Sequence, residues 1–352
     1  MRIALIAPPW APVPPLRYGG IELVVDLLAR GYQAAGHDVV LFATGDSTCP
    51  VPTSSVIERA DWSTLGQSMV ELRHVLHAHG RLAGFDVVHD HTIAGPLLAG
   101  RIPDVPLVAT MHGDLRGELA DVYRASTGAH LVAISHAQAR DVEGIEPARV
   151  IHHGVESARF PVGDGGGGYH AFLGRMCPEK GAHRAIAAAR AAGERLLLAG
   201  KIAEPLEKAY FASAIEPLLG PDVQYVGELG HDDKVALLGG ARSLLFPIRW
   251  PEPFGLVMIE ALACGTPVLA FPEGSAPEVV ADGRTGFLCA DTSAMSRAIA
   301  RVAELDRAQC RQAVEEYFCV ERMVDEHLQL FERLTTTTAG PDYVRAGRGA
   351  GR

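Results

Sequence analysis

Residues 252–260 read EPFGLVMIE, and residues 261–268 continue as ALACGTPV. The apolar residues predict a helix that begins at about Gly255 and ends at the Gly-Thr-Pro that precedes the next strand. The two acids are placed differently, with Glu252 in the loop before the helix and Glu260 between one and two turns inside it. Because an unpaired buried charge is costly, the acid inside this apolar helix needs a partner.

On both sides of this stretch, short β-branched runs alternate with longer segments of helical period. This alternation is typical of an α/β protein with parallel sheets covered on both faces. The predicted strands are 2–7, 38–43, 86–89, 106–110, 130–134, 169–173, 195–199, 222–226, 243–246, 267–271 and 286–288. The predicted helices are 20–35, 65–84, 116–126, 179–192, 204–219, 231–239, 255–264, 292–303 and a final helical stretch at roughly 307–334.

The alternation occurs twice, which predicts two Rossmann-like domains, as the 352-residue length also favours. Residues 161–169 are rich in glycine, have no apolar period and are predicted to be a linker. A phosphate-cradling loop is the alternative, but a strand follows where that loop would need a helix. The predicted parts are a first domain at 1–160, the linker, a second domain at 170–318, a C-terminal helix at 319–334 and a disordered tail at 335–352.

The composition excludes several classes of protein. A formal net charge of −10 argues against a general nucleic-acid or anionic-membrane surface, because such surfaces must neutralise phosphates. The six cysteines form no CxxC pair, so neither a disulfide framework nor a zinc ribbon is predicted. Prolines at positions 8 and 9 interrupt the first apolar run, and no later run is long enough to span a bilayer. We therefore expect a cytoplasmic protein without a transmembrane segment.

The spacing of Glu252 and Glu260, with FGLV between them and ACGTPV after them, resembles the E-x7-E signature of family 4 retaining glycosyltransferases. The resemblance implies the GT-B fold, in which two Rossmann-like, doubly wound parallel-sheet domains face each other across a cleft and the C-terminal helix returns to the first domain. It implies that Glu260 binds the ribose of a nucleotide, that Glu252 contacts the donor sugar, and that Phe254, Gly255 and Leu256 bind the donor. Two structural acids at a helix start are the alternative.

Residues 174–181, GRMCPEKG, are similar to the G-R-x-x-x-E-K-G segment of the same family. The resemblance implies that Arg175 and Lys180 hold the donor diphosphate. The physical chemistry agrees, because Gly174 frees the backbone at a strand end and two cations about one turn apart can converge on one anion. A solvated charged loop is the alternative.

Two positions in the first half also resemble the family. Gly19 and Gly20 precede a helix, where backbone N–H groups can meet a phosphate, although a glycine pair is also a common helix start. His112 follows a predicted strand, and carboxyl ends of strands are where doubly wound sheets bind ligands. The resemblance implies that His112 touches the primary hydroxyl of the donor sugar, with a core or turn histidine as the alternative.

No cofactor or metal is expected. His89 and His91 alternate as in a strand, which points both imidazoles to one side, but no further ligands occur at a suitable spacing. The resemblance implies that cations of the protein neutralise the leaving phosphate. The chain departs from the family at residues 152–154, HHG, where the family often has N-G, and at Pro253, which removes a backbone N–H donor.

These features predict an enzyme that transfers a sugar from a nucleoside-diphosphate sugar to an acceptor hydroxyl, with retention at the anomeric carbon. The acceptor, a small molecule or glycan, is expected to meet loops 8–20 and 46–66, where Trp10, Tyr18 and Trp62 offer aromatic faces. A sugar-nucleotide epimerase, a phosphorylase and a non-catalytic sugar-nucleotide-binding protein are the alternatives. A phosphorylase needs a lysine for pyridoxal phosphate, and the chain has Lys180, Lys201, Lys208 and Lys234.

Overall fold

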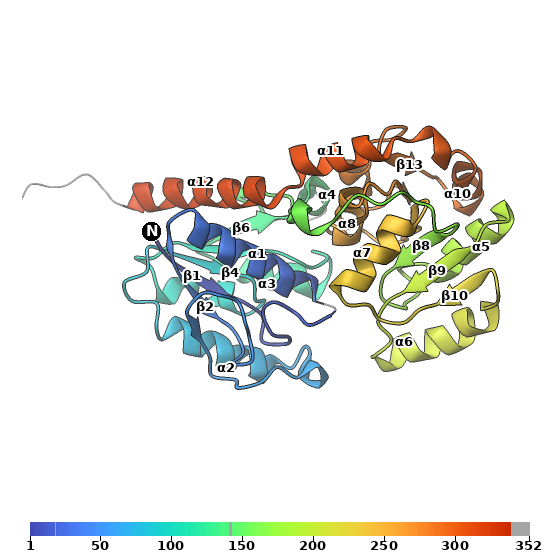
Figure 1. Cartoon of the computed structure of the whole chain (residues 1–352). Helices are drawn as coiled ribbons and strands as arrows, with labels where there is room; N and C mark the ends of the chain where they lie inside the picture. Colours follow the sequence, from blue (N-terminus) through green and yellow to red (C-terminus); the bar gives the residue numbers. More distant parts are fainter. Residues whose placement is uncertain (18, 141–142, 339–352) are drawn as a thin grey trace, which may run out of the picture.

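The computed structural model describes residues 1–17, 19–140 and 143–338, and Figure 1 shows its two α/β domains. The described residues form a seven-stranded sheet of order β3-β2-β1-β4-β5-β6-β7 and a six-stranded sheet of order β10-β9-β8-β11-β12-β13. Every strand pair is parallel. In both sheets the order reverses beside the first strand of the domain, which is the doubly wound topology that binds ligands at the strands' carboxyl ends.

The first domain has its strands at the positions predicted from the sequence, with two short additions at the sheet edges. The strands are β1 (Arg2–Ile6), β2 (Asp38–Phe42), β3 (Thr53–Ser54), β4 (Val87–Asp90), β5 (Leu107–Thr110), β6 (Ala129–Ala133) and β7 (Arg149–Val150). The helices are α1 (Gly20–Ala34), α2 (Ser68–His79), α3 (Glu118–Ala125) and α4 (His136–Arg140). The edge strands β3 and β7 have two residues each, too short to leave a period-2 pattern in the sequence.

The second domain repeats this arrangement. Its strands are β8 (His170–Leu173), β9 (Leu196–Ala199), β10 (Val223–Tyr225), β11 (Leu244–Phe246), β12 (Val268–Ala270) and β13 (Gly286–Leu288). Its helices are α5 (Ala182–Ala192), α6 (Pro205–Tyr210), α7 (His231–Gly240), α8 (Leu256–Ala263), α9 (Ala276–Val279), α10 (Thr292–Ile299) and α11 (Arg307–Tyr317). The helix predicted at 204–219 is only partly correct, because α6 passes into a π-helical turn at 211–215 and a 3-10 turn at 216–218 that contains Pro217.

The helical stretch predicted at 307–334 is two helices, α11 and α12 (Val320–Thr338). The chain is interrupted because the Phe318 carbonyl accepts the N–H of Val155 at 2.9 Å and the Val155 carbonyl accepts the N–H of Val320 at 3.1 Å. Helix α12 also continues four residues beyond the predicted start of the disordered tail at 335. The rest of that tail, 339–352, lies outside the described residues.

The C-terminal helix returns to the first domain, as predicted. Phe331 of α12 is fully buried in a core that also contains Ile3 and Leu5 of β1 and Leu28 of α1. In Figure 1, α12 runs along the first domain while α11 lies on the second. The chain therefore crosses between the domains twice, before β8 and after α11.

The glycine-rich segment 161–169 lies against the second domain. The N–H groups of Gly163 and Gly165 donate to the carbonyls of Cys264 and Gly239 at 3.0 and 3.1 Å. A Cβ on Gly163 would lie 2.1 Å from the Gly239 oxygen. From the sequence, these glycines were explained by the backbone freedom of a linker. The structure gives a second reason, because at Gly163 the chain packs too closely against Gly239 to leave room for a side chain.

Candidate active site

A cavity of about 760 Å³ lies between the two domains. Its walls come from the segments that follow β1, β5, β8, β9 and β10 and from the starts of α1 and α8, so the carboxyl ends of both sheets open into it. All of the site residues predicted from the sequence line this one cavity: Gly19, Gly20, His112, Gly174, Arg175, Lys180, Glu252, Phe254, Gly255, Leu256 and Glu260.

The start of α8 forms part of the cavity wall. Gly255 precedes the helix in the left-handed region, with φ 77° and ψ 65°. A Cβ there would lie 2.9 Å from Cε of Met258 and 3.0 Å from Cζ of Phe246, so both the backbone and the packing require glycine. Leu256 and Val257 begin the helix beside the cavity. Because the first N–H groups of a helix have no partner within it, this end of α8 can bind an anion.

Lys180 and Glu252 form an ion pair in the cavity wall. The indole N–H of Trp250 donates to the same carboxylate oxygen of Glu252 at 2.5 Å, and the Lys180 ammonium lies 5.5 Å from the centre of the Trp250 ring. The side chains of Lys180 and Glu252 are 17% and 11% exposed. The two groups predicted to hold the diphosphate and the sugar are therefore neighbours, and each limits the positions that the other can adopt.

Glu260 has the partner that its apolar surroundings require, because its carboxylate pairs with the ammonium of Lys234. Lys234 belongs to α7 and also lies 5.9 Å from the centre of the Phe160 ring. Reasoning from the sequence predicted that a partner existed but did not identify it. The two residues are 26 positions apart, and the pairing depends on how α7 packs against α8.

Arg175 lies at the carboxyl end of β8, and its guanidinium is 3.4 Å from the carboxylate of Glu207. The loop that carries Arg175 is held close to the end of the neighbouring strand β9. A Cβ on Gly200 would lie 1.8 Å from the carbonyl oxygen of Gly174, and Gly200 has φ 151°. Gly174 and Gly200 therefore allow the segments that follow β8 and β9 to come into backbone contact next to Arg175.

The first domain places the start of α1 opposite the start of α8. A Cβ on Gly20 would lie 3.2 Å from Cδ1 of Leu256. In the first turn of α1, Glu22 lines the cavity and is only 3% exposed, and burial raises its pKa to about 7. Reasoning from the sequence gave Glu22 no role. Tyr18, predicted as an aromatic face, lies outside the described residues, whereas Trp10 and Trp62 both line the cavity.

His112 belongs to a row of neighbouring imidazoles that runs from His153 to His327. His91 lies 2.8 Å from it, between Nδ1 of His91 and Nε2 of His112, and the His112 and His153 rings are stacked with centres 5.3 Å apart. The row continues from His91 to His89 at 4.2 Å and from His89 to His327 of α12 at 4.8 Å. His89 and His91 do face the same side, as predicted. We call these five residues the histidine row.

Burial keeps the histidine row uncharged. It lowers the pKa of His112 to about 3 and that of His327 to about 4, and it lowers the pKa values of His89, His91 and His153 well below the ordinary value. Within the described part of the chain, no group of three or more His, Cys, Asp or Glu side chains is arranged to hold a metal ion. At neutral pH the row is therefore uncharged, and its members His112 and His153 present neutral hydrogen-bonding groups to the cavity.

The cavity contains further polar groups that were not predicted. The ammonium of Lys201 lies 4.6 Å from the centre of the Trp62 ring, so a lysine that follows β9 meets an aromatic residue of the first domain. Other polar side chains in the wall are Arg17, Arg159, Glu204, Glu228 and His231. These side chains belong to no recognisable motif, and Arg159 ends a 3-10 turn while His231 begins α7. Only the packing of the two domains brings them together.

Two parallel-sheet domains whose strand ends open into one shared cavity define the class of two-domain GT-B proteins. Two family models match the chain, "Glycosyltransferase Family 4" over residues 18–159 and "Glycosyl transferases group 1" over residues 160–317. The chain belongs to glycosyltransferase family 4 and is an enzyme that transfers sugars.

Relatives match nearly the whole chain. A glycogen synthase of Mycobacterium tuberculosis is 28% identical over 89% of this chain and 88% of its own length. An alpha-maltose-1-phosphate synthase of Mycolicibacterium smegmatis is also 28% identical, over 93% of this chain and 97% of its own length. Both are named for reactions that make glycosidic products, which agrees with the family.

Solved structures share the fold. AviGT4, a glycosyltransferase involved in avilamycin A biosynthesis, matches with a TM-score of 0.73 and 26% identity over 96% of this chain and 98% of its own. The HepE protein of Anabaena in complex with UDP-glucose matches with a TM-score of 0.76 and 19% identity over 95% of this chain and 100% of its own. The part of the chain that the structure describes contains no helix both long and apolar enough to cross a membrane.

Proposed function

We propose that this enzyme transfers a sugar from a nucleoside-diphosphate sugar to an acceptor hydroxyl, with retention at the anomeric carbon. The observation that carries the proposal is the meeting of Arg175, Lys180 and the start of α8 in one cavity. Two cations and a helix start form a site for a polyanion such as a diphosphate. The complex of HepE with UDP-glucose, a protein of the same fold, supports this choice of donor class.

The remaining residues of the cavity fit the other parts of such a donor. Glu260 lies on α8 beyond the proposed phosphate site and has carboxylate oxygens that can accept the ribose hydroxyls. Glu252 lies on the loop before α8, beside Lys180, where it can accept hydroxyls of the sugar. His112 reaches the cavity from the first domain with a neutral imidazole, so it can bind a sugar hydroxyl without adding charge.

The chemical task is to stabilise charge. Negative charge grows on the leaving phosphate oxygen as the anomeric carbon becomes oxocarbenium-like, and groups already in place stabilise it at no cost of rearrangement. Arg175, Lys180 and the N–H groups at the start of α8 are such groups, so no metal is needed. For retention, the acceptor attacks the face that the diphosphate leaves, and the diphosphate takes the acceptor proton. We assign no protein nucleophile.

A donor screen tests the proposal. Thermal unfolding is followed with uridine, guanosine, adenosine and thymidine diphosphate sugars, because a ligand at 100 times its Kd stabilises the folded state by about 2.7 kcal/mol. One nucleotide series is expected to raise the Tm clearly above the others. The anomeric configuration of the product, read by NMR from the proton coupling, then tests retention. A product with inverted anomeric configuration would refute the retaining mechanism but not the proposed class of donor.

Glu260→Ala is expected to weaken binding of the matching nucleoside diphosphate by ~10-fold or more, because a charged acceptor of the ribose hydroxyls is lost. Titration calorimetry with the free nucleoside diphosphate measures this. Glu194→Gln is the control, since Glu194 pairs with Arg242 on the surface at 2.8 Å. Equal affinities in the wild type and Glu260→Ala would rule out the ribose role.

The phosphorylase alternative requires pyridoxal phosphate bound covalently to a lysine. Lys180 and Lys234 are ion-paired, Lys201 lies over Trp62, and Lys208 is exposed on α6. An absorbance scan of the purified protein tests the phosphorylase alternative. Absorbance of bound pyridoxal phosphate would favour it, and a protein without that absorbance would argue against it. The epimerase alternative is tested by incubating the donor without acceptor, where an epimerised nucleotide sugar would favour it over transfer.

A further inference from the structure

Outside the cavity, one carboxylate of the second domain binds the first domain directly. Glu278 of α9 accepts the backbone N–H groups of His136 at 2.8 Å and Ala137 at 2.6 Å, which begin α4. Its Oε2 atom also lies 2.8 Å from Nε2 of His152, in the segment that follows β7. The side chains of Glu278 and His152 are 15% and 22% exposed. This contact therefore joins the two domains through one half-buried side chain.

The hydrogen bonds keep Glu278 ionised. Burial raises the pKa of its carboxyl, but hydrogen bonds from His152 and from the two backbone N–H groups outweigh this and bring the pKa below its ordinary value. Three donors converge on one carboxylate, and hydrogen bonds to an ionised group are the strong ones. His152 also belongs to the segment 152–154, where the chain departs from the family pattern.

The segment that carries Glu278 also supports the loop that carries Glu252. The N–H of Ser275 donates to the Glu252 carbonyl at 3.0 Å, and its hydroxyl donates to the Phe254 carbonyl at 2.6 Å. A Cβ on Gly274 would lie 2.4 Å from both the N and the O atom of Glu252, so the two loops are in backbone contact. A displacement of α9 therefore displaces the Glu252 loop.

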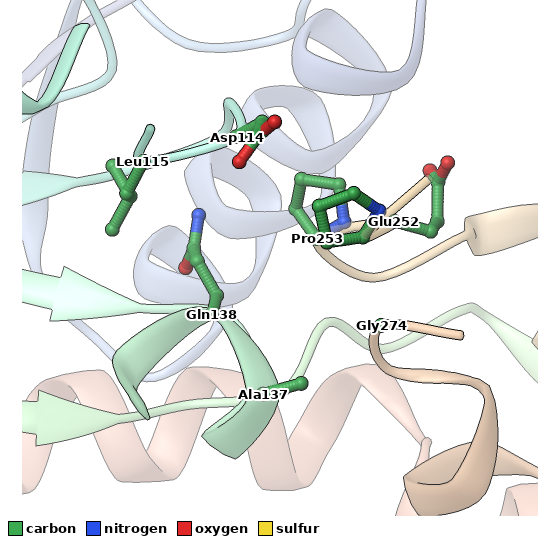
Figure 2. Close-up of a pocket in the computed structure, with 8 residues that line it drawn as sticks. Asp114, Leu115, Ala137, Gln138, Glu252, Pro253 and Gly274 are labelled. Carbon is green, nitrogen blue, oxygen red and sulfur yellow. The ribbon is translucent and has the colours of Figure 1, made fainter. Parts of the chain in front are cut away.

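Figure 2 shows the crevice between these parts, with Ala137 and Gln138 of α4 on one side and Glu252, Pro253 and Gly274 on the other. The crevice has a volume of only about 10 Å³, about the room for one water molecule. The first domain thus lies directly against the loop that holds Glu252, with Glu278 as the polar contact beside it.

We propose that Glu278 is a positioning residue, which fixes the Glu252 loop at the donor sugar by binding the first domain through α4 and His152. The proposal rests on the proposed function, since it assigns Glu252 to the sugar. Glu278 acts through its neighbours and touches no substrate. With the two domains in contact, the three hydrogen bonds of Glu278 hold α9, and the bonds of Ser275 within the second domain pass this restraint to the carbonyls on both sides of Pro253. When the domains open, that restraint is lost and the sugar contact loosens.

The test separates sugar transfer from nucleotide binding. Glu278→Ala is expected to lower kcat for transfer by ~10- to 100-fold, because a misplacement of about 1 Å at the reacting centre has effects of that size. The affinity for the nucleoside diphosphate chosen by the donor screen is expected to stay within about twofold, because its proposed ligands, Lys180, Arg175 and Glu260, all belong to the second domain. Calorimetry and initial rates give both numbers.

His152 supplies a second pair of variants in case Glu278→Ala folds poorly. His152→Ala removes the side-chain donor, and His152→Gln supplies an amide N–H in its place, so the glutamine variant is expected to recover most of the lost kcat. Glu304→Gln is the matched control, because Glu304 is an exposed carboxylate that pairs with Arg301 of its own turn at 2.8 Å. A domain-to-domain fluorescence transfer pair reports closure on adding the nucleoside diphosphate and is expected to show less closure in Glu278→Ala.

The outcomes distinguish the two proposals. A wild-type protein that neither binds a nucleoside diphosphate nor transfers sugar overturns the proposed function. If the wild type does both and folded Glu278→Ala keeps its kcat, only the positioning role is overturned. A parallel loss of kcat and nucleotide affinity, with no recovery in His152→Gln, also overturns it, because that result describes general damage to the fold.

Discussion

Lys180→Ala and Arg175→Ala are each expected to lower the rate of sugar transfer by ~100-fold or more, the scale of losing one preorganised donor of transition-state stabilisation. Both side chains line the cavity beside the start of α8. The charge that they stabilise develops during the reaction, so the loss falls on kcat as well as on kcat/KM. Initial rates with the donor found in the screen measure it.

The effect has a second source at Lys180. Removing the ammonium leaves Glu252 beside the proposed diphosphate without its partner, so an anion faces an anion. Lys208→Ala is the control, because Lys208 is an exposed lysine of α6 in the same domain. Rates like those of the wild type in both Lys180→Ala and Arg175→Ala, with circular dichroism unchanged, would refute the mechanism.

Acid is expected to unfold this protein at a higher pH than carboxylate protonation alone would require. An unfolded imidazole takes up a proton near pH 6.5, whereas the histidine row stays neutral until the pH is far lower, with the pKa of His327 lowered to about 4. Between these values the unfolded state binds more protons than the folded state, so the free energy of unfolding decreases as the pH falls. Above about pH 6.5 the histidine row therefore does not reduce the free energy of unfolding, and below about pH 6.5 it reduces this free energy progressively.

The size of this effect is large. Each buried imidazole lowers the free energy of unfolding by about 1.4 kcal/mol per pH unit in that window, and the whole stability of a typical domain is about 5 to 15 kcal/mol. His89, His91, His153 and His327 are each no more than 3% exposed. The first domain is therefore expected to lose stability steeply as the pH falls below about 6.5. Thermal melts between pH 8 and pH 4.5 measure this.

His327→Phe tests the assignment to the histidine row. Phenylalanine can occupy the site beside Phe331 but takes up no proton, so the pH dependence of the unfolding free energy is expected to become shallower by about 1.4 kcal/mol per pH unit. His136→Asn is the control, because His136 is an exposed histidine at the start of α4. A Tm that does not change between pH 8 and pH 5 in the wild type would show that the row does not govern acid stability.

Much of the fold could be predicted because its signals are local. Most strands are one apolar run and most helices one periodic segment, so β8 and α8 were placed from their own residues, whereas the two-residue strands β3 and β7 were not. The stretch 307–334 was predicted to be helical with a boundary at 318, but the cause of the break could not be predicted, because it depends on Val155, far away in the sequence. The end of α6 was wrong for a local reason, a proline whose effect on the helix was not taken into account.

The candidate site divides in the same way. Motif residues such as Arg175, Lys180 and Glu260 were identified from the sequence, and they share one cavity. The partners were not identified. The sequence did not predict that Lys234 pairs with Glu260, that Glu278 binds α4, or that His112 lies against His91 and His153, because each contact joins different elements. A single sequence does not show which residues form such pairs. It shows only that a buried charge needs a partner, and this need correctly predicted that Glu260 would have one.

The sequence by itself determined the class of the protein, its two α/β domains and the motif residues of the site, because local propensity and spacing act within one element. Only the tertiary structure decided which charges pair, which histidines stack and where the two domains touch. Those contacts depend on distances between residues far apart in the chain, and the packing of whole helices and sheets sets these distances.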